Sequence, residues 1–461
     1  MRCSIQPSPR EQQIVEEKGV RHEGEPIAVP RSGLKNSTGV LVNVFIRQLT
    51  GVRFLAAAWV LLYHLQVPLA TIGLVGIPVL SDFFRVGRLG VDLFFALSGF
   101  ILAHTYLERM GEKFKVKTSG FFLWLRLGRI YPVHLVMLVV AGVAVFAQAK
   151  VTGDALDRDW LTPWDFIKNL LMIQEWGSQP QRGWNFVAWS LSMEWLVYLL
   201  FPFIVLVLWR FRRSLPTWGL LVAWVIVLIP LLAYGLNTTD SYYTDNWGST
   251  IRVLTEFIAG GITYLVVSRL HPGLQGDPAP KVERIATWLT IILPILVVIG
   301  SVILANMPAA QPPQLNLGED SEPLPPYFHL LLVPLLIAWI GALALSRRGL
   351  TKTLGTQALV LGGFISYSLY MTHLVWFGLW RAGMKAAGID GGGLYTLGVI
   401  GLVIGALVIA WLMWKFIEEP AREWMRKLIG VRPVPTEEAG AAIAQRQHET
   451  DGAEPIVVED K

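Results

Sequence analysis

The sequence predicts an all-α polytopic membrane protein with about ten transmembrane helices. Of its 461 residues, 53% are hydrophobic and only 16% are charged, whereas the surface of a soluble protein of this length would need more charge. Apolar runs of about 18 to 25 residues recur along the chain, and this is the length that spans a bilayer. The single cysteine, Cys3, lies in a polar segment, so neither disulfides nor a cysteine metal cluster are expected.

Polar segments flank the apolar region on both sides. Residues 1–46 and 426–461 contain many charged residues and prolines and no long apolar run, a composition typical of disorder. The first segment also lacks the short basic region and apolar stretch of a signal peptide. We therefore expect two disordered cytoplasmic tails and, between them, one transmembrane domain over residues 47–425.

Hydropathy places the helices in order along the chain. The predicted spans are 48–71, 86–107, 130–152, 186–209, 217–235, 250–268, 285–306, 327–346, 358–381 and 393–417. Pro132 is expected at the start of the third span, where its missing N–H does least harm. The segment TPWDFIKNLLMIQEW (162–176) is too short and too mixed to span, so it predicts an interfacial helix between the third and fourth spans.

Basic residues alternate between the connections and so indicate the orientation. The connections at 236–249 and 307–326 contain no Lys or Arg. The second–third, fourth–fifth, sixth–seventh and eighth–ninth connections contain Arg109, Lys113, Lys115, Lys117, Arg126, Arg129, Arg210, Arg212, Arg213, Arg269, Lys281, Arg284, Arg347, Arg348 and Lys352. Because basic connections stay in the cytoplasm, we expect both termini there, in a multi-pass protein of the plasma (inner) membrane.

Five ionisable residues from five predicted spans fall at one depth in the outer half of the bilayer. They are His64, Asp92, Glu194, Glu256 and His373. A charge inside the bilayer costs roughly 2.5 to 3.5 kcal/mol on insertion scales, so such residues face a polar interior and are functional candidates. The simpler interpretation is a structural hydrogen-bond network between helices. Two histidines and three acids at one level favour function.

Three arginines form a second group toward the cytoplasmic side. Arg53 precedes His64 by eleven residues, which places both on one helix face about 16 Å apart along the axis. Arg126 and Arg129 are three residues apart and also share a face. A guanidinium inside apolar sequence suits a phosphate ligand through paired hydrogen bonds. The spacing therefore indicates a phosphorylated carrier, such as a coenzyme A thioester, whose reactive end meets His64 as a base.

Several segments then resemble the bacterial membrane-bound acyltransferase family 3 over about residues 47 to 425. They are LTGVRFLAAAWVLLYH, with Arg53 and His64 in an Arg-x10-His pattern, GVDLFFALSGFIL, RLGRIYP with Arg126 and Arg129, WSLSMEW, SYSLYMTH and FIEEPAREW. The resemblance implies a ten-helix bundle and acyl-CoA-dependent O-acylation of a hydroxyl, an EC 2.3.1 type of reaction. Acetyl is the default acyl group, and envelope glycans, glycolipids and exported small molecules are the implied acceptors.

The resemblance also implies roles for residues. His64 is the essential histidine, and Arg53, Arg126 and Arg129 bind the acyl-CoA phosphates. Glu194 joins the catalytic residues, whereas His373, Glu256 and Ser98 lie on the acceptor side, with packing favoured over nucleophilic chemistry for Ser98. From the depth argument, we expect Asp92 to orient His64 and to stabilise its imidazolium form.

Other interpretations remain open at this stage. Intramembrane His, Asp and Glu residues also serve proton-coupled transporters or exporters, and a non-catalytic acyl-sensing or assembly protein is a third class. No metal site is expected, because the chain lacks the paired His/Cys spacing of metal sites. No permanently bound cofactor and no nucleic acid are expected; acyl-CoA is the donor substrate, and separate envelope-biosynthesis proteins are possible partners.

Overall fold

A computed structural model describes residues 46–153, 161–177, 184–237, 247–274, 277–306 and 328–430. Residues 1–45 of the predicted tail 1–46, and residues 431–461 of the predicted tail 426–461, lie outside the described part. Every regular element in the described part of the chain is a helix. Nine helices there are long and apolar enough to cross a membrane, which confirms the predicted all-α polytopic membrane class.

The helices follow one another with short connections. Their bounds are α2 (Arg47–His64), α3 (Gln66–Thr71), α4 (Pro78–Arg85), α5 (Leu89–Met110), α6 (Val116–Thr152), α7 (Pro163–Leu170), α8 (Ala188–Ser214), α9 (Thr217–Asn237), α10 (Gly248–Leu270), α11 (Pro280–Ala305), α12 (Val333–Leu345), α13 (Leu350–Leu354), α14 (Gln357–Ala386), α15 (Gly392–Met413) and α16 (Glu419–Leu428). Short 3₁₀ turns, η1 (Leu74–Gly76), η2 (Pro272–Leu274) and η4 (Phe328–Leu332), lie between them.

The first predicted span is divided in the structure. Helix α2 ends at His64, and α3 begins at Gln66, so together they occupy the region predicted as one helix. Arg53 and His64 make α2 more polar than the nine long apolar helices of the described residues, and it is not among them. The break matters for function because it places His64 at a helix end rather than in a helix interior.

Two other helices differ from the hydropathy prediction. Helix α6 begins at Val116, not at 130, and Pro132 lies in its interior, so the expectation that Pro132 begins a span is wrong. Hydropathy missed the first part of α6 because this part carries Arg126 and Arg129. The helix continues through Pro132 because neighbouring groups in membrane proteins compensate for the hydrogen bond that an interior proline removes. The predicted interfacial helix exists as α7, and α4 was not predicted.

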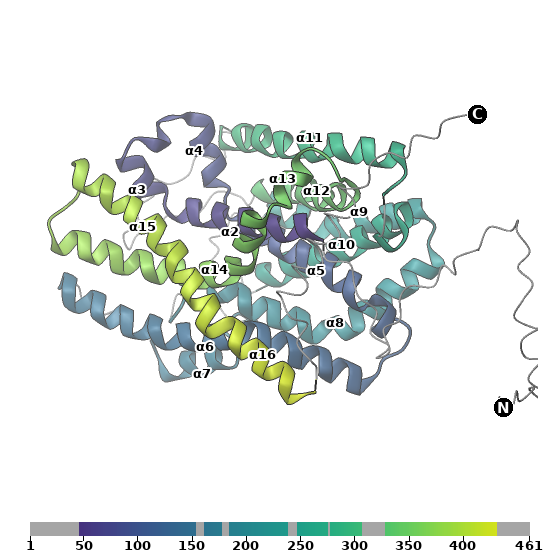
Figure 1. Cartoon of the computed structure of the whole chain (residues 1–461), viewed down its shortest axis with the longest axis horizontal. Coiled ribbons are helices and arrows are strands. Elements are labelled where there is room, and N and C mark those ends of the chain that lie inside the picture. The colour runs from purple at the N-terminus through teal and green to yellow at the C-terminus, as the bar shows by residue number, and fades with distance from the viewer. Residues whose placement is uncertain are drawn as a thin grey trace, which may run out of the picture. The chain divides into compact units, whose positions relative to one another are not determined.

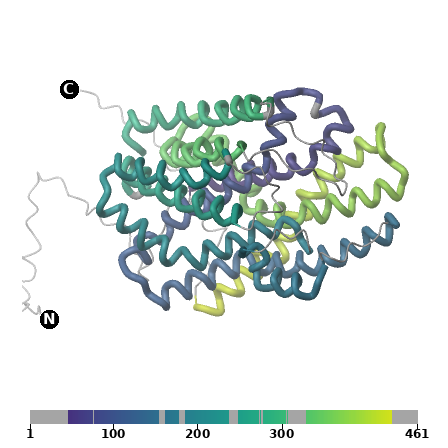
Figure 2. The backbone as a smooth tube through the Cα atoms, turned by 180° about the vertical axis from the view of Figure 1, so that it is seen from behind, coloured from purple at the N-terminus to yellow at the C-terminus, as the bar shows by residue number. Residues whose placement is uncertain are grey.

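Helices α5 and α10 form the centre of the helices between 46 and 430. In each, 72% of the most apolar 18-residue stretch is buried, against 22% for α11 and for the helix that continues from α15 into α16. Helix α11 lies on one side of α2, α5 and α14, and α6 lies on the opposite side (Figure 1; Figure 2). The outer faces of α9 and α11 expose large apolar side chains, as lipid contact requires.

Glycines allow the two central helices to touch. A Cβ atom added to Gly99 of α5 would lie 1.9 Å from the carbonyl oxygen of Phe257, and one added to Gly260 of α10 would lie 2.1 Å from that of Ala96. Such close approach is typical of small residues at membrane helix interfaces. The close contact of α5 with α10 therefore depends on these two glycines.

We expect Gly99→Ala to lower the midpoint temperature of unfolding in detergent, because α5 and α10 must separate to admit the methyl group. Overpacking of this kind costs about 1 to 3 kcal/mol. Gly120→Ala on α6 is the control, since its Cβ would meet no atom within 4 Å and alanine favours a helix. Equal midpoints for Gly99→Ala and the parent protein would contradict the close contact.

Candidate functional site

The end of α2 and the middle of α14 bring two histidines together. His64 is the last residue of α2, and His373 lies in α14. His64 Nδ1 and His373 Nε2 are 3.2 Å apart, and the ring centroids are 5.0 Å apart. His373 is buried, whereas the His64 side chain is partly exposed. The two histidines that the sequence placed at one depth are thus in direct contact.

Two backbone carbonyls determine which ring nitrogens carry protons. His373 Nδ1 lies 2.7 Å from the carbonyl oxygen of Tyr370, and His64 Nδ1 lies 3.0 Å from that of Val60. A carbonyl oxygen only accepts hydrogen bonds, so each Nδ1 is the donor and each neutral ring has its lone pair on Nε2. The single proton on His64 Nδ1 is therefore shared between two acceptors, the Val60 carbonyl and His373 Nε2. The Nε2 of His64 has no hydrogen-bond partner among the described residues, so it can act as a general base.

The structure corrects the predicted role of Asp92. Its two carboxylate oxygens accept hydrogen bonds from Arg252 of α10, at 2.5 Å from Nε and 2.6 Å from Nη2. Asp92 and Arg252 are both buried, and paired hydrogen bonds of this kind suit the planar guanidinium. The predicted pairing of Asp92 with His64 is wrong, because Arg252 occupies the carboxylate and His373 supports His64 instead.

Glu256 belongs to the same buried ion cluster. Its Oε1 lies 3.7 Å from Arg252 Nε, and neither carboxylate oxygen has a hydrogen-bond partner within the described residues. The predicted polar layer is thus divided, because Asp92 and Glu256 link α5 to α10 while the histidines link α2 to α14. Arg252 was missed, although its position four residues before Glu256 in an apolar helix is the spacing of an ion pair.

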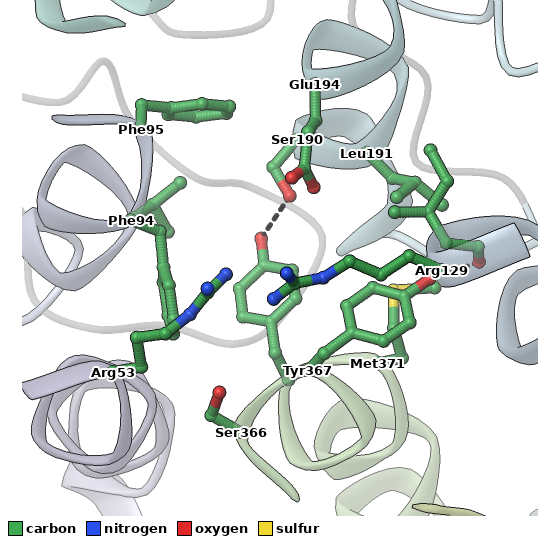
Figure 3. A pocket seen from close by; sticks show the side chains of 13 residues that line it. Arg53, Phe94, Phe95, Arg129, Ser190, Leu191, Glu194, Ser366, Tyr367 and Met371 are labelled. Carbon is green, nitrogen blue, oxygen red and sulfur yellow. Dashed lines mark hydrogen bonds between the residues drawn. The ribbon is translucent and has the colours of Figure 1, made fainter. Parts of the chain in front are cut away.

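A cavity lies between α2, α5, α6, α8 and α14 (Figure 3). Its apolar lining includes Phe94, Phe95, Ile130, Leu191 and Met371, and its polar lining consists of Arg53, Arg129, Ser190, Glu194, Ser366, Tyr367 and Tyr370. Arg53 and Arg129 extend into it from different helices (Figure 3). An apolar cavity with a few converging polar groups is the usual form of a small-molecule site.

The arginines of this cavity make no ion pair with the acids that the structure describes. Neither Arg53 nor Arg129 makes a hydrogen bond or ion pair within the described residues, and the Nε of Arg53 is buried without a partner. The nearby acid, Glu194, accepts a hydrogen bond from the hydroxyl of Tyr198. An unpaired guanidinium in a membrane interior is costly. Its presence here indicates an anionic ligand.

Arg126 lies one turn before Arg129 and does not line the cavity. Its Nη2 donates to the hydroxyl of Tyr106 at 3.4 Å, and it lies within electrostatic reach of Glu194. Two of the three arginines predicted to bind phosphate thus share one cavity, and the third lies one turn away along α6. Glu194 lies with these arginines in the cavity, not with the histidine pair.

Tyr370 connects the cavity with the histidine pair. It lines the cavity, its hydroxyl accepts a hydrogen bond from Ser190 at 2.8 Å, and its backbone carbonyl binds His373. His64 is not among the lining residues. Tyr370 is therefore a residue that the cavity shares with the surroundings of the histidine pair. Ser190 and Tyr370 were missed, since only their places in the WSLSMEW and SYSLYMTH segments marked them.

Ser98 of α5 is buried beside the contact that Gly99 makes with α10. It neither lines the cavity nor hydrogen-bonds to the histidines in the described part of the chain, so its position is that of a packing residue. Within the same residues, no group of three or more His, Cys, Asp or Glu side chains could hold a metal ion.

Glu175 is a buried acid outside the membrane-spanning helices. It follows α7, accepts a hydrogen bond from Ser249 at 3.2 Å, and donates one from its backbone N–H to Ser192. Its Oε2 is buried without a hydrogen-bond partner among the described residues. Burial raises the pKa of Glu175 from 4.5 to about 7, although the Ser249 hydrogen bond opposes the shift. This acid joins the segment after α7 to the beginnings of α8 and α10.

Comparison with known proteins identifies the domain. Residues 46–415 match the family described as the acyltransferase domain, acyltransferase family 3. The chain is 28% identical over 426 residues to the acyltransferase MdmB of Streptomyces mycarofaciens, covering 85% of this chain and 95% of that protein. No solved structure gives a significant match.

A second relative, from Staphylococcus aureus strain COL, has a name that describes it as an O-acetyltransferase. It is 23% identical over 403 residues, covering 84% of this chain and 59% of that protein. The chain therefore spans about three fifths of the length of this relative. A protein from the picA locus of Rhizobium radiobacter is 46% identical over 65 residues, which are 14% of this chain and 32% of that protein.

We expect Glu175→Gln to flatten the pH dependence of stability between about pH 4.5 and 7. In this window the folded protein keeps the proton on Glu175 while the unfolded chain has released it, so stability falls as the pH rises. The shift corresponds to about 3 kcal/mol. Unfolding midpoints measured across this range, with the exposed Glu112→Gln as control, test it. A steeper or unchanged profile in Glu175→Gln would contradict the assignment.

Proposed function

Because the chain belongs to acyltransferase family 3, we propose that it transfers an acetyl group from cytoplasmic acyl-CoA to a hydroxyl group. The acceptor is an envelope glycan, a glycolipid or an exported small molecule. The coarser statement stands on the comparisons: the chain is an O-acyltransferase with several helices able to span a membrane. Family membership also favours this enzyme over the transporter and acyl-sensing alternatives.

The observation that carries the proposal is the pair of contacts that His64 Nδ1 makes with the Val60 carbonyl and with His373 Nε2. These contacts put the proton on Nδ1 and leave the lone pair on Nε2. This nitrogen takes the proton of the acceptor hydroxyl while the oxygen attacks the thioester carbonyl. The tetrahedral intermediate collapses, the carbon–sulfur bond breaks, and the imidazolium returns the proton to the leaving thiolate. The products are an O-ester and free coenzyme A. His373 Nε2, which accepts from His64 Nδ1, stabilises the imidazolium during this sequence.

The cavity supplies the donor side of the reaction. Arg53 and Arg129 have no carboxylate partner in the described part of the chain, and phosphate oxygens are suitable ligands for them. Arg53 lies about 16 Å along α2 from His64, so an elongated thioester held at one could react at the other.

The choice of acetyl as the acyl group is supported by the name of a relative, and the side from which the acceptor approaches is supported by the expected orientation in the membrane. A relative with an O-acetyltransferase name favours acetyl. The orientation expected from the basic connections puts His64 in the outer half of the plasma membrane and the arginines on its cytoplasmic side. An acceptor hydroxyl would then approach from the face opposite to the donor.

We expect His64→Ala to abolish acyl transfer and to leave donor binding within about threefold of the parent protein, because the base is removed and the arginines remain. Cells fed labelled acetate report transfer into the envelope fraction and the medium. Calorimetry of the purified protein with acetyl-CoA reports donor binding. Normal labelling by the variant would refute the role of His64, and a parent protein that fails to bind acetyl-CoA would refute the donor.

His373→Phe should lower transfer about 100-fold or more, because His64 loses the acceptor that stabilises its imidazolium. His373→Gln should recover a substantial part of the activity, since the amide oxygen can accept from His64 Nδ1. Donor affinity should be the same in both variants. If Phe and Gln were equally impaired, or neither were impaired, His373 would not act through this hydrogen bond.

A further inference from the structure

Helix α16 packs against the part of α6 that carries the arginines. The indole Nε1 of Trp124 donates a hydrogen bond to the carbonyl of Met425 at 2.8 Å. Met425 also lies over Gly128, where an added Cβ would come within 3.0 Å of its sulfur. The π-helical segment Trp414–Glu418 joins α15 to α16 and directs α16 toward α6. The contact therefore fixes which side chains of α16 approach α6.

This contact adds two arginines to those of α6. Arg426 lies within electrostatic reach of Arg126 and Arg422 and makes no hydrogen bond or ion pair with any described residue. Arg422 pairs with Glu419, but its Nε is buried and has no partner in the part of the chain that the structure describes. The Nε of Arg126 is buried in the same way. These three guanidiniums share a single carboxylate ion pair, which favours an anionic ligand.

The arginines follow one another away from the histidine pair. Arg53 lies about 16 Å along α2 from His64, and Arg129 lies within electrostatic reach of Arg53. Arg126 is one turn nearer the start of α6, and Arg426 is beyond it on α16. A coenzyme A molecule whose thioester reached His64 would bring its diphosphate to the first arginines. Its ribose 3′-phosphate, farthest from the sulfur in this direction, would reach α16.

We propose that Arg426, together with Arg422 and Arg126, forms the subsite for the ribose 3′-phosphate of the donor. The inference rests on the proposed function, because it takes coenzyme A as the carrier. Anchoring to anionic lipid headgroups uses the same phosphate chemistry. Lys427 has the exposure that anchoring needs, whereas Arg426 is partly buried and lies within reach of Arg126. We therefore favour the nucleotide.

The experiment compares coenzyme A with 3′-dephospho-coenzyme A. Binding to the parent protein, Arg426→Gln and the matched control Lys427→Gln is measured by calorimetry. Each protein is placed in nanodiscs of phosphatidylcholine alone and in nanodiscs that also contain phosphatidylglycerol. We expect the parent and Lys427→Gln to bind coenzyme A about tenfold more tightly than the dephospho form in both lipids. Arg426→Gln should bind both nucleotides equally, with the affinity that the parent has for the dephospho form.

Each other outcome counts against the inference. If Arg426→Gln weakened the binding of both nucleotides by the same factor, or changed the binding of neither, the residue would not contact the 3′-phosphate. The donor assignment would then stand. If its effect appeared only with phosphatidylglycerol, the ligand would be a lipid headgroup. A parent protein that bound neither nucleotide would overturn the donor assignment and this subsite together. Arg426→Lys serves as a folding check, since it keeps the charge and should retain part of the preference.

Discussion

The hydrogen bond between His64 and His373 is the contact on which the chemistry of this site depends. It requires α2 and α14 to approach closely, and a glycine permits this: a Cβ added to Gly363 would lie 2.0 Å from the carbonyl oxygen of Thr50. It also requires α2 to end at His64, so that the ring is partly exposed while its Nδ1 stays against Val60. Two backbone carbonyls then fix the tautomers of both rings, and no carboxylate of the described residues hydrogen-bonds to either ring.

The arginines of the bundle are of two kinds, those that form an ion pair with an acid and those that line the cavity and could bind an anionic ligand. Arg252 is buried, and Asp92 accepts hydrogen bonds from its Nε and Nη2, so this ion pair links α5 to α10. Arg53 and Arg129 line a cavity without an acidic partner among the described residues. Because charges in a low-dielectric interior interact strongly, this difference in pairing separates structural cations from binding cations.

Hydropathy and charge predicted most of the fold, because a bilayer imposes one length and one composition on every span. The ends of elements were harder to predict. Helix α6 begins fourteen residues before its predicted start. The prediction missed these residues because Arg126 and Arg129 lower the local hydropathy, although they do not prevent a helix. The break at Leu65 has a signal that hydropathy does not register: Pro68 has no N–H to bond the carbonyl of His64, four residues before it.

The sequence predicted which residues belong to the site more reliably than it predicted which of them contact one another. The sequence singled out both histidines and the cavity arginines, because charged groups are rare in apolar segments. It paired His64 with Asp92, since depth along a helix carries no information about which face meets which neighbour. Arg252 had a local signal in its spacing to Glu256, whereas Tyr370 had none, because an aromatic side chain in a membrane helix is ordinary.

The most direct measurement is the protonation state of the His64 ring. Nitrogen NMR of protein with ¹⁵N-labelled histidine in nanodiscs, with His64→Ala used to assign the signal among the 8 histidines, distinguishes the two neutral tautomers. The account predicts that neutral His64 carries its proton on Nδ1 and has a bare Nε2, with a coupling across the hydrogen bond to His373. A neutral His64 protonated on Nε2 would contradict it.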